Sequence, residues 1–254
     1  MTIVEKTTRA GRPRAIPDAA PNLPPREQIL LAAAELFVNQ GFGSTSTRAI
    51  ADAVGMRQAS LYYHFAGKDD ILAELLERSV RPSTDLAVRL LAQAGPDPRA
   101  CAAALYALAA SDTALLAGAP HNVGSLYLIP EARDPRFDAF RAQRDELQQV
   151  YGRLGHRARA LAPGSGGTSD DTATSNDAAT SDDAATSDDA ATSHDTPEPL
   201  LAALLMQTVE VVIPLRQAGM TGIEASAVAE AALRLIGLNP TQVRTAAADA
   251  AGLA

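Results

Sequence analysis

Apolar residues recur at helical spacing through most of the chain. In the segment 26–39 they form one stripe, which predicts a helix with a buried face: Ile29, Leu30, Ala33, Leu36 and Phe37. The same period predicts further helices over 68–94, 98–117, 134–162, 199–217 and 222–236. Pro82 is expected to kink or break the 68–94 helix, because proline has no amide hydrogen to donate. The pattern predicts an all-α fold.

Between residues 44 and 68 the pattern predicts two short helices joined by a tight turn. In the first, Ile50 and Val54 share a face and Gly55 ends the helix. In the second, Leu61 and Phe65 share one side. The opposite side carries small residues and tyrosines, namely Ala59, Ser60, Tyr62 and Tyr63. Exposed tyrosines beside small residues indicate a surface that binds a partner.

Two short helices closed by a tight turn are typical of a unit that places its second helix in the major groove of DNA. The residue types fit that groove. Gln58 can pair with a base edge through its amide, and small neighbours let the helix approach closely. Tyr63 and His64 offer donors to phosphate, and Lys68 opens the next helix, where phosphate is favoured.

Four ordered motifs in this region resemble the N-terminal domain of the TetR family of transcriptional regulators: Gly41-Phe42, Thr47–Ala51, Ser60–Phe65 and Lys68–Leu72. The resemblance covers residues 23–76. It implies an all-α homodimer with an N-terminal three-helix helix-turn-helix DNA-binding domain at 23–83, whose helix-turn-helix lies at about 46–65. It also implies a C-terminal helical ligand-binding and dimerisation domain at 84–240.

The resemblance also implies roles for single residues. Thr47 and Tyr63 would contact phosphate, and His64 and Lys68 would anchor the DNA backbone. The residues expected at or near base edges, or allowing close approach to them, are Arg48, Gln58, Ala59, Ser60 and Tyr62. Taken alone, Arg48 fits an ordinary solvated charge, and His64 fits a surface histidine. The ordered spacing of the whole set favours DNA binding.

Charge is unevenly distributed along the chain. The net charge of the 254 residues is -8, but nine acids and no Lys or Arg lie between Pro163 and Pro199. That stretch, 163–197, is an acidic low-complexity repeat with a period of six, and we expect it to be a flexible insertion in the C-terminal domain. The arm 1–22 is basic and Pro-rich and is expected to be disordered. The composition of this arm is compatible with a segment that contacts DNA, and equally with a solvated tail. Residues 241–254 are expected to be a tail.

The C-terminal half offers candidate residues for two tasks. Two late apolar helices would form the homodimer interface in the resembling family, and ordinary intrachain core is the alternative. The candidate interface residues are Leu201, Leu204, Leu205, Thr208, Val212, Val228, Ala232 and Leu235. A pocket for a small, moderately apolar effector would be lined by Tyr106, His121, Asn122, Tyr127 and Gln143, each of which also fits a structural role.

These features predict a ligand-responsive regulator that binds a palindromic operator on double-stranded DNA, most simply as a repressor released by its effector. The alternatives are a dimeric small-molecule-binding protein without operator binding, or an enzyme. The histidines have no acids at catalytic or metal-ligand spacing, so neither a metal nor a cofactor is expected. A single cysteine, Cys101, and the absence of an apolar leader or a membrane-length apolar stretch predict a cytoplasmic protein.

Overall fold

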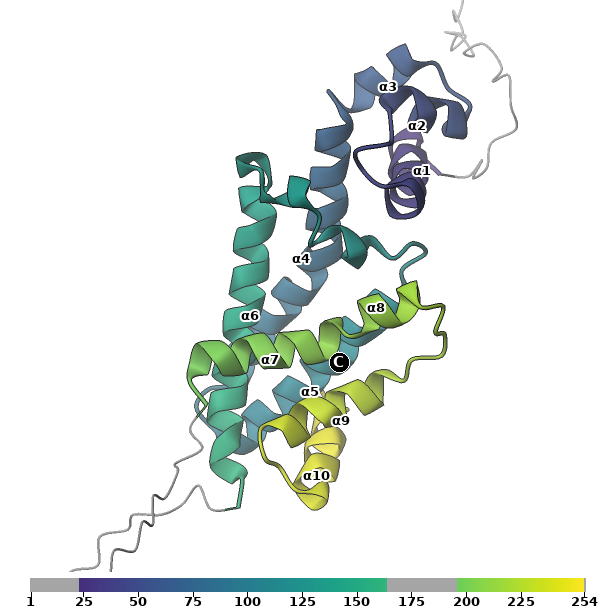
Figure 1. Cartoon of the computed structure of the whole chain (residues 1–254). Helices are drawn as coiled ribbons and strands as arrows, with labels where there is room; N and C mark the ends of the chain where they lie inside the picture. The colour runs from purple at the N-terminus through teal and green to yellow at the C-terminus, as the bar shows by residue number, and fades with distance from the viewer. Residues whose placement is uncertain (1–22, 164–195, 254) are drawn as a thin grey trace, which may run out of the picture. The chain divides into compact units, whose positions relative to one another are not determined.

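A computed structural model describes residues 23–163 and 196–253 (Figure 1). Within these ranges the chain forms α-helices and short 3-10 helices and no strand, which confirms the predicted all-α fold. It divides into two compact units. Among the described residues, the first contains 23–82 and 118–143, and the second contains 83–117, 144–163 and 196–253. The basic arm and almost all of the acidic repeat lie outside the described residues.

The first unit is built on α1 (Pro25–Gln40), α2 (Thr47–Val54), α3 (Gln58–His64) and the start of α4 (Lys68–Ala94). Their facing apolar side chains form its core, which includes Ile29, Phe37, Ile50, Leu61, Ile71 and Leu72. Gly41 and Gly55 end α1 and α2 with φ of 87° and 72°, a backbone conformation that other residues adopt only with strain. These two glycines fix where the turns fall.

The first unit also contains residues 118–143, which the sequence had assigned to the C-terminal domain. This segment holds three 3-10 helices, η1 (Val123–Leu126), η2 (Pro130–Arg133) and η3 (Pro135–Phe137). It packs on α1 and α4, since Leu126 and Phe137 are buried, η1 contacts α1 and the Tyr127 hydroxyl donates to Ser79 Oγ at 3.0 Å. Contacts of this kind join segments that are far apart in the sequence, so no pattern within residues 118–143 predicts them.

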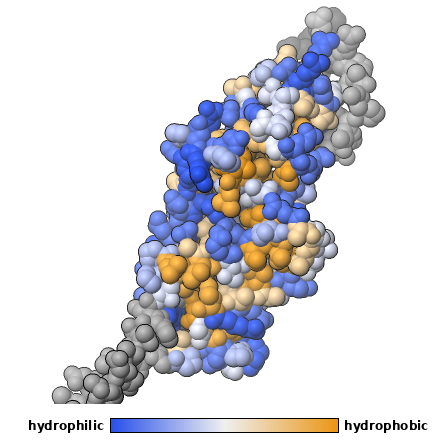
Figure 2. All heavy atoms as spheres, viewed as in Figure 1, coloured by the Kyte–Doolittle hydropathy of each residue, from blue (hydrophilic) through white to orange (hydrophobic). Residues whose placement is uncertain are grey.

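The second unit contains α5 (Pro98–Gly118), most of α6 (Asp138–Ala158), η4 (Arg159–Leu161), α7 (Glu198–Glu210), α8 (Val212–Gln217), α9 (Ala225–Leu235) and α10 (Pro240–Ala250). Helix α7 approaches α6 closely at a glycine. A Cβ at Gly152 would lie 2.8 Å from Ala202 Cβ, which is too close for any side chain. Figure 2 shows apolar side chains gathered over α7 and α9.

Helix α4 runs from Lys68 to Ala94 as predicted and is not broken at Pro82. Two other predictions about helix limits were wrong. The predicted 199–217 helix is divided at Val211 into α7 and α8. The expected tail 241–254 contains most of α10, which starts at a capping box on Asn239 and buries its inner face.

The prediction that no apolar stretch has membrane length was also wrong. Two helical stretches of the described chain, Pro98–Gly118 and Glu198–Gln217, are long and apolar enough to cross a membrane. The first is mostly buried within the chain, as the core helix of a soluble protein is. Length and composition alone are weak evidence for a membrane span.

Candidate nucleic-acid interface

The geometry of α2 and α3 is set by capping and by buried anchors. The Ser46 hydroxyl caps α2 by accepting from the Ala49 amide at 3.1 Å, as a serine N-cap does. Leu61 is fully buried and Phe65 nearly so, which holds the inner face of α3 against the core. The opposite face of α3 is therefore presented to solvent.

The end of α3 is held by a cation from α1. The Arg26 guanidinium donates to the His64 carbonyl at 2.7 Å, forms an ion pair with Glu74 and lies 4.1 Å above the Phe65 ring. Arg26 is therefore a structural residue of the first unit. These three contacts explain why its position is fixed although its side chain is only half-buried.

The outer face of α3 carries the predicted small and aromatic residues. Ala59 and Ser60 are exposed, and the exposed fractions of Tyr62 and Tyr63 are 49% and 88%. The Tyr63 and His64 rings pack edge to face, with their centroids 5.3 Å apart. An 88% exposed tyrosine contributes nothing to the core, so its place on this face favours a role in binding.

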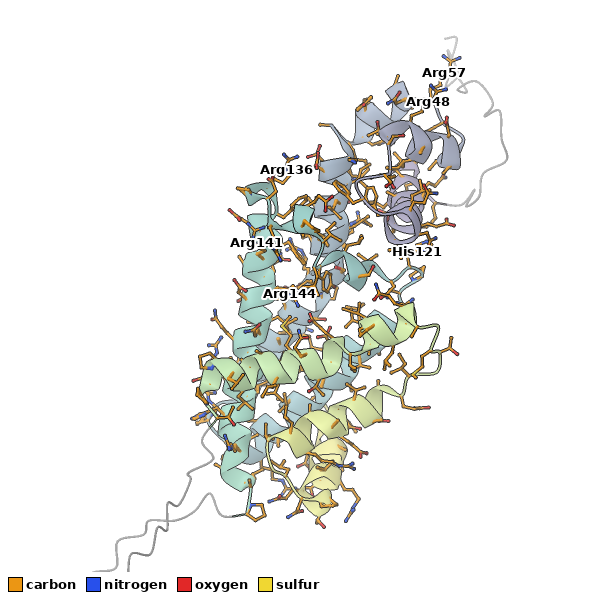
Figure 3. The ribbon with its side chains drawn as sticks, in the orientation of Figure 1. Arg48, Arg57, His121, Arg136, Arg141 and Arg144 are labelled. Carbon is orange, nitrogen blue, oxygen red and sulfur yellow. The ribbon has the colours of Figure 1, made fainter. Side chains whose placement is uncertain are left out.

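Two arginines project from this region (Figure 3). Arg48 lies on α2, and within the described part of the chain its one ion pair is a long one, 3.8 Å, with Asp52, which is also exposed. Arg57 is the residue immediately before α3 and is exposed, and among the described residues no acid pairs with it. The sequence reasoning missed Arg57. Its position in the turn, directly before Gln58, is the sequence feature that could have identified it.

Three predicted DNA-contacting residues are linked by hydrogen bonds across the turn. The Gln58 amide nitrogen Nε2 lies 2.9 Å from Thr47 Oγ1 and 3.4 Å from the Tyr62 hydroxyl oxygen. The Thr47 and Tyr62 hydroxyls are themselves 3.2 Å apart. We call Thr47, Gln58 and Tyr62 the polar triad. It joins the first residue of α2 to the first turn of α3 on the exposed side.

The structure gives Lys68 contacts within the protein. Its ammonium donates to the carbonyl oxygens of Phe42, Thr45 and Gly43 at 2.9, 3.1 and 3.4 Å, and lies 4.4 Å above the Phe42 ring. These carbonyls belong to the loop between α1 and α2. In this arrangement the three ammonium hydrogens are directed at the loop, so the predicted phosphate contact competes with three existing bonds.

The five candidate pocket residues are divided between the two units. Tyr106 lies in the second unit, whereas His121, Asn122, Tyr127 and Gln143 lie in the first. Tyr127 is packed against Phe140, with ring centroids 5.3 Å apart. A surface pocket of about 270 Å³ does occur in the second unit, beside Leu90, Asp97, Arg99 and Asp249 and without any of the five candidates.

Half of the candidate dimer residues are buried in the chain's own core. Those at 4% exposure or less are Leu201, Leu205, Val212 and Ala232. They cannot contact a second chain, which corrects the prediction for these four. Leu204 and Leu235 are 40% and 44% exposed, and Thr208 and Val228 are partly exposed. Leu200 and Val211 add to this apolar face at 52% and 40%.

The second unit also buries an acidic residue that the sequence reasoning missed. Asp112 on α5 accepts from the Ser83 hydroxyl at 2.7 Å and from the Tyr151 hydroxyl at 3.1 Å. Burial, together with the nearby Glu210, raises the pKa of Asp112 to about 6, against the lowering effect of these two donors. Glu210 forms an ion pair with Arg144. The neighbouring Thr113 hydroxyl is buried, and no described residue forms a hydrogen bond with it.

A helix-turn-helix with an exposed outer face is typical of DNA-binding proteins, and comparisons with known proteins identify the family. The model of bacterial regulatory proteins of the tetR family matches residues 29–75. The structure aligns with the crystal structure of Mycobacterium smegmatis AmtR with a TM-score of 0.73 and 37% identity, over 93% of this chain and 98% of that one. The chain belongs to the TetR family of transcriptional regulators.

Two curated relatives match over the N-terminal region only. The repressor KstR2 of Mycobacterium tuberculosis is 43% identical over 51 residues, which are 20% of this chain and 26% of that protein. The regulator AcrR of Shigella flexneri is 37% identical over 73 residues, which are 29% of this chain and 34% of that protein. The chain therefore aligns with about a third or less of each of these relatives.

Proposed function

We propose that this protein is a transcriptional regulator that binds a palindromic DNA operator as a homodimer and is released from it by a small-molecule effector. The observation that carries the proposal is the outer face of α3, where Tyr62 and Tyr63 are exposed beside Ala59 and Ser60. A helix with this face fits the major groove, because small residues allow close approach and hydroxyls reach phosphates.

In the proposed complex, the first turn of α3 faces base edges and its end faces the backbone. Gln58 and Arg48 read bases, while Thr47, Tyr63 and His64 bind phosphate oxygens. Arg57, as an exposed cation in the turn, adds a phosphate contact. Lys68 is proposed to act on the loop whose carbonyls it binds.

The apolar face of α7, α8 and α9 supports the homodimer. It contains the exposed side chains of Leu200, Leu204, Val211 and Leu235, and α7 packs directly on α9 (Figure 2). Contiguous exposed apolar surface of this kind is typical of an interface between protein chains. Two protomers joined there would present two α3 helices, as an inverted repeat requires.

Effector control is supported by helices that belong to both units. Helix α4 starts at Lys68 in the first unit and ends at Ala94 in the second, and α6 also passes from one unit to the other. Binding of an apolar compound in the second unit can then favour a conformation in which the α3 helices no longer match two half-sites. The change in DNA affinity is limited by the difference in the ligand's affinity for the two conformations.

The same family membership favours a regulator in the bacterial cytoplasm over an enzyme, since the similar proteins named above are transcriptional regulators. Repression is the simplest direction of control, because a dimer bound at an operator blocks access to the promoter.

Selection from a random double-stranded library by the purified full chain, at low ionic strength, tests the proposal. We expect enrichment of an inverted repeat with half-sites about one helical turn apart or a multiple of it. A protein that enriches no sequence is not an operator-binding regulator and is better described as a binding protein of the same fold. A mobility-shift titration of the selected site with candidate compounds then tests effector control.

A further inference from the structure

The polar triad restricts how Gln58 can present its side chain to DNA. A free glutamine amide has two donor hydrogens and one acceptor oxygen, and rotation exchanges the edge it offers. In this structure Gln58 Nε2 lies within hydrogen-bond distance of both Thr47 Oγ1, at 2.9 Å, and the Tyr62 hydroxyl oxygen, at 3.4 Å. Both amide hydrogens are therefore directed at the protein.

The group that remains for an outside partner is the carbonyl oxygen Oε1 of Gln58. Gln58 is exposed at the start of α3, on the face that also carries Ala59. The Thr47 and Tyr62 hydroxyls are 3.2 Å apart, so one donates to the other and a single hydroxyl hydrogen remains outward. The triad thus offers one carbonyl acceptor and one hydroxyl donor.

Each base pair carries one amino group in the major groove, and base pairs differ in which strand carries it. Adenine N6 and cytosine N4 each carry amino hydrogens there, whereas guanine and thymine present only acceptors at the corresponding positions. A carbonyl oxygen beside a hydroxyl donor also matches the N6 hydrogen and N7 acceptor of adenine. A glutamine held in this orientation therefore discriminates between the two groups of bases.

We propose that Thr47 and Tyr62 set the base preference of Gln58: they hold its amide hydrogens and present its carbonyl oxygen, which accepts from the amino group of adenine or cytosine on the strand that it faces in each half-site. The inference rests on the proposed operator binding. Thr47 and Tyr62 are positioning residues in this role, since they act on the base through Gln58.

The test repeats the library selection with variants of the triad. Gln58→Ala first identifies the position, as the one whose base preference is lost. Thr47→Val and Tyr62→Phe each remove one hydroxyl and leave the side chain's shape nearly unchanged, so we expect the preference for the selected base pair there to fall roughly tenfold. Thr47→Ser keeps the hydroxyl and is expected to keep the preference.

Tyr63→Phe is the matched control, because it removes the same hydroxyl from the adjacent tyrosine, which lies outside the triad. It should weaken binding to all sequences equally and leave the preference at the Gln58 position unchanged. Gln58→Glu provides a second check. A carboxylate only accepts, so this variant should still select the same base pair, with lower affinity for every site because of its charge.

Removal of the amino group from the adenine or cytosine of the selected base pair should weaken binding by the wild-type protein, and unchanged affinity for that site would overturn the inference. An unchanged preference in both Thr47→Val and Tyr62→Phe would overturn it as well. Failure of the wild-type protein to select any sequence is a different result, which rejects operator binding itself. Circular dichroism of each variant confirms that a changed preference does not come from unfolding.

Discussion

Substitution of Lys68 can show whether its ammonium stabilises the fold or binds DNA. Its ammonium donates to carbonyls of Phe42, Gly43 and Thr45, in the loop that leads to α2. The Thr45 hydroxyl also donates to Gly41 O at 2.8 Å, so the loop is closed from two sides. Because Thr47 follows this loop, Lys68 fixes where α2 and the polar triad begin.

Lys68→Met keeps most of the side chain's length and removes the charge. Each hydrogen bond from a charged donor contributes roughly 1.5–3 kcal/mol, and the three bonds share one ammonium and include a long one. We therefore expect the free energy of unfolding to fall by about 2–4 kcal/mol in urea denaturation. DNA affinity should fall as well, because the start of α2 is less well held.

The salt dependence of operator binding distinguishes the two roles. If Lys68 neutralised a phosphate in each protomer, Lys68→Met would reduce the slope of log K against log[salt] by roughly 0.9 per contact. A lysine that binds the loop carbonyls predicts a nearly unchanged slope. Fluorescence anisotropy at four salt concentrations, on the site selected by the wild-type protein, measures it.

Arg57→Met is the matched control for Lys68→Met. Arg57 is exposed and unpaired among the described residues, so its loss should reduce the slope and change the free energy of unfolding by less than about 0.5 kcal/mol. Our reasoning about Lys68 is refuted if Lys68→Met behaves like Arg57→Met, with a lower slope and unchanged stability.

Three further predictions concern the second unit. Burial raises the pKa of Asp112 from 3.8 to about 6, so the folded state takes up a proton that the unfolded state does not, and stability rises as the pH falls through 6. As the pH falls from 7.5 to 4.5, the free energy of unfolding of the wild-type protein, measured by urea denaturation, should rise by about 2 kcal/mol relative to that of Asp112→Asn. An equal change with pH in the two proteins would contradict this. Gly152→Ala should be less stable than Gly118→Ala by about 1–3 kcal/mol in thermal unfolding, since the Cβ at 152 meets α7 and the one at 118 meets open space. Leu204→Glu should shift the dimer to monomer in sedimentation velocity, whereas Leu128→Glu, at a residue 80% exposed in the first unit, should not; a Leu204→Glu dimer would place the interface elsewhere.

The DNA-binding helices were the part of the fold that the sequence predicted best. Their limits depend on local signals, namely the cap at Ser46, the turn at Gly55 and the buried spacing of Leu61 and Phe65. The limits of α10 were missed although Asn239 and Pro240 form a strong start signal. Its buried face consists of valine and alanine, which give a weak apolar stripe.

Contacts between elements distant in sequence could not be predicted. The polar triad depends on how α2 and α3 meet, and the three carbonyls bound by Lys68 depend on the path of a loop 23 to 26 residues earlier. The dimer candidates show the same difficulty. Leu204 and Leu205 are neighbours on one apolar helix, yet one is 40% exposed and the other fully buried. Composition marks that helix as apolar, but only packing determines which face remains exposed.

The central claim is that α3 lies in the major groove. Methylation interference on the selected operator tests it most directly, because guanine N7 is exposed in the major groove and adenine N3 in the minor groove. We expect N7 methylation to block binding at guanines in both half-sites of the inverted repeat. Interference confined to adenine N3, with every guanine N7 tolerated, would contradict the claim.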